Sequence, residues 1–276
     1  MSFARDPTLY SGSARFYRGG RLPYAPGIAD GIARALGLEG RGRLLDVGCG
    51  PGIVALELTS WFEEVVGLDA DAEMIAEAER ETRRRGVANA SWHHLRAEEL
   101  PAGLGRFRVA TLAQSFHWMD RERVAAAIHA MLEGDGGLVH VNAYTRTGIE
   151  STSPLPHPQP PWEAIGELVR RYLGSETRAG QGLRGAALSG EDQIFRHWFV
   201  GPLVVKVPDG RVLTRTPDNV VAAVYSVSSS APHLFGDRLG AFESELRQLL
   251  AETSPSGTFS QQTGDTELRI WRPLGG

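Results

Sequence analysis

Residues 44–56 read LLDVGCGPGIVAL, a short apolar run followed by three glycines in a G-x-G-x-G spacing. The run predicts a strand over 43–48, and Pro51 suits the first turn of a helix that we expect to continue to about Trp61. Glycines in a turn between a strand and a helix let the backbone approach a ligand closely. This turn therefore decides both the fold and the kind of ligand.

The alternation of strand and helix continues toward the C-terminus. β-Branched and apolar runs predict strands over 64–70, 91–97, 107–116 and 137–144, and helical patterns occupy 71–86 and 120–137. Strands separated by amphipathic helices indicate βαβ units and a parallel sheet. The predicted fold class is α/β.

Beyond residue 150 this pattern breaks. The proline-rich stretch 152–162 predicts a connecting loop, since proline suits neither a helix interior nor a central strand. Helical spacing returns over 165–172 and 239–249, and strands are expected over 201–207 and 266–273. Without an internal repeat or a flexible linker, we expect one domain over 1–276, with a ligand-binding core at 41–146 and a substrate-side insertion and last strands at 147–276.

Composition narrows the class of protein. The 276 residues are 42% hydrophobic and 22% charged, and their net charge is −4. Proteins that bind nucleic acid normally carry an excess of basic residues, so this charge argues against a nucleic-acid partner. The single cysteine, Cys49, excludes an intrachain disulfide and fits a reducing cytoplasm. Neither a signal peptide nor a membrane span is apparent, so we expect a cytoplasmic protein without a membrane partner. The histidines lack ligand spacing, and we expect no metal.

The residues around the glycines discriminate between ligands. A P-loop requires a lysine and a hydroxyl residue after its last glycine, where Ile53 and Val54 stand. A dinucleotide site requires its third glycine at position 53, which disfavours a nicotinamide-dependent dehydrogenase without excluding it. Asp46 would repel a pyrophosphate but suits an amino or sulfonium group. Asp69, at the end of the next strand, suits ribose hydroxyls. S-adenosylmethionine has these parts and no phosphate.

Four motifs in order resemble those of the class I S-adenosylmethionine-dependent methyltransferases: LLDVGCGPG (44–52), VVGLDAD (65–71), RAEELP (96–101) and SFHWMD (115–120). The chain is most similar to bacterial small-molecule methyltransferases that also carry a segment like RFYRGGRLPY (15–24). The resemblance implies a Rossmann-like, mostly parallel sheet flanked by helices. It also implies an N-terminal helical lid over 1–40 and a C-terminal elaboration over the substrate side.

The resemblance implies roles in holding S-adenosylmethionine, with S-adenosylhomocysteine as the product. Gly48 and Gly50 let the loop approach the methionine moiety, and Asp46 orders that site. Asp69 holds the ribose hydroxyls, and Ala70 lies beside the adenine. The alternative for each aspartate is a carboxylate that caps a turn.

The third and fourth motifs and the lid supply further expected contacts. Arg96 stands where many relatives have an acidic residue, so we expect Glu98 to meet the adenine amine and the Ala97 amide to face the ring. A purely structural role is the alternative for Glu98. Gln114 is expected at the methionine end of the cofactor. Tyr17 in the lid is expected near the sulfonium, which an aromatic face attracts.

His117 is the candidate catalytic base, since its ordinary pKa range suits proton abstraction near neutrality. The alternative is a cofactor contact or a structural role. We expect a bacterial enzyme, a monomer or homodimer, that methylates a small-molecule acceptor, most readily at oxygen. The alternatives are methylation of RNA or protein, a non-methylating reaction such as a cyclisation, and a non-catalytic cofactor-binding subunit. Aromatic residues such as Phe199, Tyr225 and Phe235 are candidates to line the substrate pocket, although each is more readily a core residue.

Overall fold

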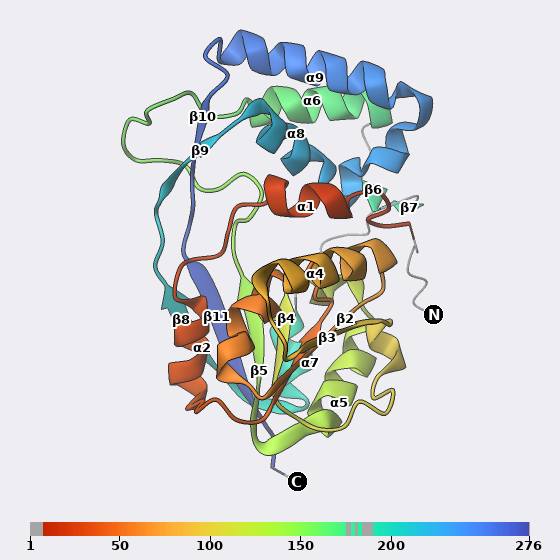
Figure 1. The fold of residues 1–276 in the computed structure, drawn as a ribbon, viewed down its shortest axis with the longest axis vertical. Helices are drawn as coiled ribbons and strands as arrows, with labels where there is room; N and C mark the ends of the chain where they lie inside the picture. The colour runs from red at the N-terminus through yellow and green to blue at the C-terminus, as the bar shows by residue number, and fades with distance from the viewer. Residues whose placement is uncertain (1–7, 175–177, 180–181, 184–189, 276) are drawn as a thin grey trace.

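Seven strands form one sheet in the order β3-β2-β1-β4-β5-β11-β8 (Figure 1). The structure is a computed structural model that describes residues 8–174, 178–179, 182–183 and 190–275. The strands are β1 (Arg43–Val47), β2 (Glu64–Asp69), β3 (Ala90–His94), β4 (Phe107–Ala113), β5 (Leu132–Asn142), β8 (Phe199–Val207) and β11 (Thr266–Pro273). The mixed, mostly parallel sheet confirms the predicted α/β class.

The strand order places the carboxyl ends of β1 and β4 side by side. The strands β1 to β5 run parallel, and β11 lies antiparallel between β5 and β8. From β1 the chain builds outward to β2 and β3, and then returns to add β4 and β5 on the other side of β1. Ligands of open α/β sheets bind at such a reversal, outside the carboxyl ends of the strands.

Helices cover both faces of the sheet. The helices α2 (Ile28–Leu36) and α3 (Ile53–Leu58) share one apolar cluster with the sheet, and α5 (Arg121–Met131) and α7 (Glu191–Arg196) share a second one. The helix α4 (Ala72–Arg85) packs on β2 and β3. Within the described residues, no helix combines the length and the apolarity that a membrane crossing requires.

A second, helical layer lies beyond the carboxyl edge of the sheet. In Figure 1 the helices α6 (Trp162–Leu173), α8 (Pro217–Tyr225) and α9 (Leu239–Thr253) stack there, and α1 (Ala14–Gly20) lies between them and α4. This layer has its own apolar cluster, which α6, α8 and α9 share. The ribbon of β9 (Val212–Arg215) and β10 (Phe259–Gln262) accompanies it, and β6 (Arg178–Ala179) pairs with β7 (Gly182–Leu183).

Several boundaries differ from those that the sequence predicted. The helix α3 begins at Ile53 and not at Pro51, because Gly52 adopts a left-handed φ of 72°. The helix α5 ends at Met131, and the glycine-rich stretch after it extends β5 back to Leu132. The strand β4 ends at Ala113, since Gln114 has a φ of 57°. The helices α1 and α2 lie within the N-terminal helical lid expected over 1–40, whereas α8 and the β9–β10 ribbon had not been predicted.

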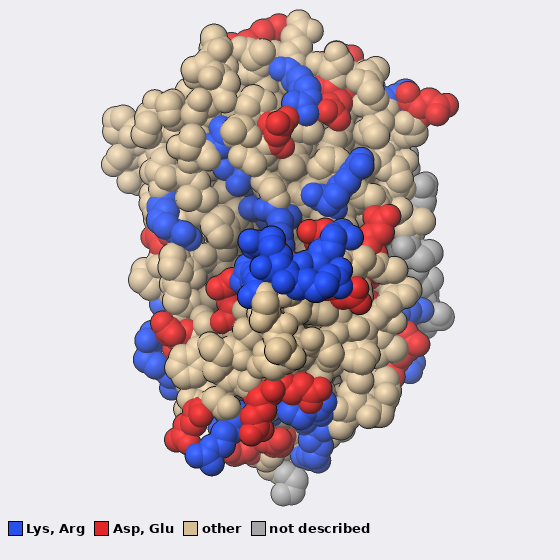
Figure 2. All heavy atoms as spheres, viewed as in Figure 1, with Lys and Arg blue, Asp and Glu red and all other residues tan. Residues whose placement is uncertain are grey.

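The arginine-rich end of α4 forms the largest basic patch on the face in Figure 2. Each of its arginines has a glutamate three or four residues earlier on the same helix: Arg80 with Glu77, Arg83 with Glu79, and Arg84 and Arg85 with Glu81. Such pairs neutralise one another on a helix surface. The patch is therefore a set of internally paired side chains.

Candidate functional site

The glycine turn is hydrogen-bonded to the end of β2. The amides of Gly48 and Cys49 both donate to the Leu68 carbonyl, at 2.8 and 2.9 Å. Gly48 has a φ of 68°, and a Cβ there would lie 2.6 Å from Cβ of Ser115. The Ser115 hydroxyl in turn donates to the Val47 carbonyl at 2.7 Å. Only glycine fits where the turn passes this close to the segment after β4.

The other two glycines of the motif serve different purposes. A Cβ on Gly50, at φ 53°, would meet no atom within 4 Å, because this residue faces an open cavity. A Cβ on Gly52 would instead lie 2.5 Å from Cη2 of Trp92. Gly67 lies against the same indole, with its Cβ position 2.4 Å from Cε3. Gly50 thus makes room for a ligand, whereas Gly52 and Gly67 make room for a side chain.

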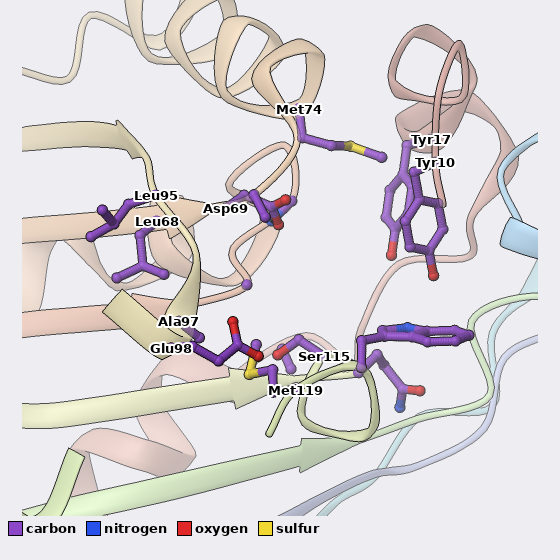
Figure 3. A pocket seen from close by; sticks show the side chains of 16 residues that line it. Tyr10, Tyr17, Leu68, Asp69, Met74, Leu95, Ala97, Glu98, Ser115 and Met119 are labelled. Atoms are coloured by element: carbon purple, nitrogen blue, oxygen red, sulfur yellow. The ribbon is translucent and has the colours of Figure 1, made fainter. Parts of the chain in front are cut away.

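A cavity opens at the carboxyl ends of β1, β2 and β4 (Figure 3). Its wall consists of residues from the lid, the glycine turn and the ends of β2, β3 and β4: Tyr10, Tyr17, Gly48, Gly50, Leu68, Asp69, Ala70, Met74, Leu95, Ala97, Glu98, Ala113, Gln114, Ser115, Trp118 and Met119.

Two backbone amides hold the Asp69 carboxylate in place at the cavity. Oδ2 accepts from the Gly50 amide and Oδ1 from the Asp71 amide, each at 2.9 Å. In Figure 3 the carboxylate faces the open space between the strand ends and the lid. A carboxylate has about four lone-pair positions, so it retains acceptor capacity for hydroxyl groups of a ligand.

Asp46 lies behind the wall and does not line the cavity. Its side chain is 1% exposed, and Oδ1 accepts from the Thr111 hydroxyl at 2.7 Å. Burial raises the pKa of Asp46 to about 6, although the hydrogen bond from Thr111 opposes the shift. Among the described residues, Oδ2 has no hydrogen-bond partner. A carboxylate in this state favours a positive charge nearby.

Glu98 lines the cavity and also holds the polypeptide chain. Its Oε1 accepts from the Asp120 amide at 3.0 Å, and its Oε2 lies 3.5 Å from Nε of Arg96. Ala97 and Glu98 open the 3₁₀ turn Ala97–Glu99 directly after β3. The structural role that the sequence left open for Glu98 is therefore present, and its position in the wall leaves a ligand contact available.

Three aromatic rings close the cavity on the lid side. Tyr10 and Tyr17 from the N-terminal segment meet edge to face with centroids 6.5 Å apart, and Tyr10 lies 6.3 Å from Trp118 at 90°. In Figure 3 both tyrosines face the acidic strand ends across the cavity. Burial is the main cause that raises the pKa of Tyr10 to about 12. The rings present apolar faces and neutral hydroxyls to a ligand.

The charges of the wall select the kind of ligand. Asp69 and Glu98 lie in the wall, and none of the lysines, arginines or histidines among the described residues lines it. A pyrophosphate would meet carboxylates without a compensating cation, which is unfavourable. A cationic centre would meet carboxylates and aromatic faces, which both attract it. The cavity fits S-adenosylmethionine and disfavours a dinucleotide.

Eight of the ten predicted site residues lie in the cavity wall: Tyr17, Gly48, Gly50, Asp69, Ala70, Ala97, Glu98 and Gln114. Of the other two, Asp46 lies behind the wall and His117 lies beside it. His117 belongs to the 3₁₀ turn Phe116–Trp118, and its ring lies 4.6 Å from that of Trp118. Its role as a base stays a prediction.

The structure adds apolar residues that sequence reasoning missed, namely Met74, Leu95 and Met119. Nothing in their spacing separates such residues from core residues. Phe199, Tyr225 and Phe235 were considered for a substrate pocket but lie buried in apolar clusters, because their helices and strand turn them inward. Among the described residues, no group of three histidine, cysteine, aspartate or glutamate side chains is placed to hold a metal ion.

The comparisons with known proteins concern this same region. The model of a methyltransferase domain family matches residues 44–136. An uncharacterised methyltransferase of Bacillus subtilis, YcgJ, is 28% identical over 141 residues, which are 50% of this chain and 55% of that protein. Its crystal structure matches at a TM-score of 0.51 and 19% identity, over 90% of this chain and 98% of that one.

Two further relatives act on different atoms. A malonyl-[acyl-carrier protein] O-methyltransferase of Enterobacter lignolyticus is 31% identical over 57% of this chain and 60% of that protein. A ubiquinone/menaquinone biosynthesis C-methyltransferase of Citrifermentans bemidjiense is 33% identical over 41% of this chain and 51% of that protein. The matches thus span between 51% and 60% of the curated relatives' length. The matched family model, the sheet order and the cavity agree that residues 44–136 form a methyltransferase domain.

Proposed function

We propose that this protein transfers a methyl group from S-adenosylmethionine to a small-molecule acceptor. The observation that carries the proposal is the cavity at the β1–β4 reversal, which is walled by carboxylates and aromatic rings. When bound there, the cofactor supplies an electrophilic methyl carbon activated by a sulfonium. The residues of the chain then bind the cofactor, orient the acceptor and exclude water.

Residues at the ends of different strands hold different parts of the cofactor. Asp69, held by two amides, accepts the ribose hydroxyls, and Ala70 lies beside the base. Glu98 and the Ala97 amide face the adenine end, on the turn after β3. Gly50 leaves room for the methionine end. Asp46 behind the wall favours the positive charge that this end of the cofactor carries.

The lid aromatics and the acceptor path complete the reaction site. Tyr10, Tyr17 and Trp118 exclude water and place π faces toward a sulfonium. Holding the acceptor in line with the methyl group contributes about 7–11 kcal/mol to such a displacement. Gln114 lies in the wall of the cofactor cavity and also in that of a second hollow. The acceptor enters through this hollow, which Asn142, Tyr144, Ile149, Lys206 and Glu267 also line.

Oxygen is the proposed acceptor atom. A hydroxyl acceptor must lose a proton, and His117, next to the wall residue Trp118, is the proposed base. A carboxylate acceptor is already deprotonated at neutral pH and needs no base. The similarity to an O-methyltransferase supports oxygen as the acceptor atom, while the similarity to a C-methyltransferase makes carbon the alternative. The identity of the methylated product decides between the two.

The test follows a label from the cofactor to its acceptor. The protein is incubated with S-adenosylmethionine carrying a deuterated methyl group and with a cell extract, which is then divided into small-molecule, protein and RNA fractions. We expect new labelled masses in the small-molecule fraction with the wild type and a clearly reduced yield of them with Asp69→Ala. Label confined to protein or RNA would contradict the proposal, and fragmentation of the labelled product identifies the methylated atom.

A further inference from the structure

Two arginines come together where the lid meets the carboxyl edge of the sheet. Arg21 follows α1, and Arg146 follows β5 by four residues. The Leu22 amide donates to the Thr145 carbonyl at 2.7 Å, which holds the two chain segments side by side. The Arg21 guanidinium lies 4.9 Å from the ring centroid of Tyr17, a residue of the cofactor cavity.

The charges of this pair are not compensated. Nε of Arg21 and Nε of Arg146 are both buried without a hydrogen-bond partner, and neither guanidinium forms an ion pair with a described residue. Burial lowers the pKa of Arg146, and the charge of Arg21 lowers it further. Buried charges are normally paired, because an unpaired one is costly to remove from water. Two partly buried guanidiniums on neighbouring chain segments, without a carboxylate partner, therefore suit an external anion.

The other buried arginines of this region have structural explanations. Arg215 donates to the carbonyls of Gly19 and Gly20 at the end of α1, at 3.0 and 2.7 Å. Arg18 donates to the Pro51 carbonyl and lies 3.7 Å from the Glu81 carboxylate. Arg21 has only part of such an explanation, since one of its terminal nitrogens donates to the Ser226 carbonyl at 2.9 Å. Arg146 has no comparable side-chain partner among the described residues.

The position of the pair indicates the acceptor side of the site. Neither arginine lines the cofactor cavity or the second hollow. Arg21 lies on Tyr17, which lines the cavity, and Arg146 stands in the sequence between Tyr144 and Ile149, which line the hollow. An anion held by the pair would therefore lie close to residues of both.

We propose that Arg21 and Arg146 bind a carboxylate of the methyl acceptor, so that the acceptor is an organic acid. The planar fork of a guanidinium matches the bidentate geometry of a carboxylate, and a second guanidinium adds positive charge. The inference rests on the proposed function, since it assumes that the second hollow admits the acceptor. The methionine carboxylate of the cofactor has the same chemistry, and the experiment separates these two sources.

The first measurement is the melting temperature of the S-adenosylhomocysteine complex with benzoate and hexanoate, each compared with its neutral amide. We expect the acids to raise the melting temperature of the wild type and the amides to leave it unchanged, by mass action. Arg21→Gln and Arg146→Gln should abolish the rise. Arg83→Gln, which removes an exposed arginine of α4, should keep it. Equal effects of acids and amides would overturn the proposal.

A second experiment tests whether the carboxylate comes from the acceptor or from the cofactor. The same proteins are titrated with S-adenosylhomocysteine and with 5′-methylthioadenosine, which lacks the amino-acid part. We expect both affinities to change by less than about threefold in Arg146→Gln. An affinity for S-adenosylhomocysteine that falls about tenfold, with that for methylthioadenosine kept, would assign the pair to the cofactor and overturn the proposal. A wild type that binds neither ligand would overturn the proposed function itself, before any variant is compared.

The melting temperature of the ligand-free protein tests whether Arg146 has a merely structural role. Because Arg146 is a partly buried charge without a partner, Arg146→Gln should leave the ligand-free protein at least as stable as the wild type. A clear fall in its melting temperature would mean that the guanidinium is compensated within the protein, and would overturn the proposal.

Discussion

The substitution Gly52→Ala separates the structural glycine of the motif from the ligand-facing one. Gly52 has a φ of 72°, and its Cβ would lie 2.5 Å from the Trp92 ring. The indole is held in place, since its Nε1 donates to the Thr82 hydroxyl at 2.8 Å and its other edge lies on Gly67. A left-handed alanine costs about 1–2 kcal/mol, and overpacking costs about 1–3 kcal/mol more. The free energy of unfolding should therefore fall by about 2–5 kcal/mol.

Gly50→Ala is the matched control, because Gly50 is also left-handed but its Cβ would project into the open cavity. It should lose only the backbone cost of about 1–2 kcal/mol in stability. Its affinity for S-adenosylhomocysteine should instead fall about tenfold or more, because the methyl group occupies ligand space. Urea unfolding and calorimetric titration of both variants measure the two effects. The reasoning is refuted if Gly52→Ala is as stable as Gly50→Ala, or if Gly52→Ala alone loses affinity for the ligand.

Three further predictions concern titratable groups. Hydrogen bonds from Arg84, the largest cause, and from Arg85 lower the pKa of Glu81 to about 2. The stabilising contribution of Glu81 is therefore complete above the pKa of the unfolded chain and is lost as pH falls from about 4.5 to 2. Glu81→Gln should cost about 1.5–3 kcal/mol at pH 7, and urea unfolding should show the difference from wild type vanishing near pH 2. Burial lowers the pKa of His140 to about 4, so the unfolded chain binds more protons between pH 6.5 and 4, and stability should fall as pH falls through this window. His140→Gln should flatten that dependence in unfolding curves at pH 7, 5.5 and 4.5, and an unchanged slope would contradict the burial argument. His117→Gln should lower kcat by about 10²–10⁴-fold, as expected for the proposed base of a hydroxyl acceptor; a loss of less than about tenfold would contradict that role and agree with a ring outside the cavity wall.

The sequence predicted the sheet and most residues of the cavity wall because both depend on local patterns. Apolar runs that end in glycine or aspartate mark the carboxyl ends of β1 and β2, and parallel strands bring such ends to one edge. Asp69 and Gly50 were predicted in this way, and they meet through a direct hydrogen bond. Tyr17 came from the resemblance of the lid segment, and the structure places its ring in the wall.

The remaining features depend on contacts between residues far apart in the sequence. The reason for Gly52 is the indole of Trp92, 40 positions away and on another strand. The pairing of Arg21 with Arg146 likewise arises only when the lid packs on the segment after β5. The helical layer was underestimated because its apolar spacing predicts helices but gives no sign of which surface they cover.

The measurement that tests the cofactor assignment most directly is calorimetric titration of the wild type with S-adenosylhomocysteine, with NAD as the competing ligand. Asp69→Ala and the exposed-site control Asp30→Ala are titrated beside it. We predict binding in the micromolar range, about −8 kcal/mol, that is kept in Asp30→Ala, weakened about tenfold or more in Asp69→Ala, and absent for NAD. Binding of NAD by the folded protein, or an affinity for S-adenosylhomocysteine that does not depend on Asp69, would contradict the account.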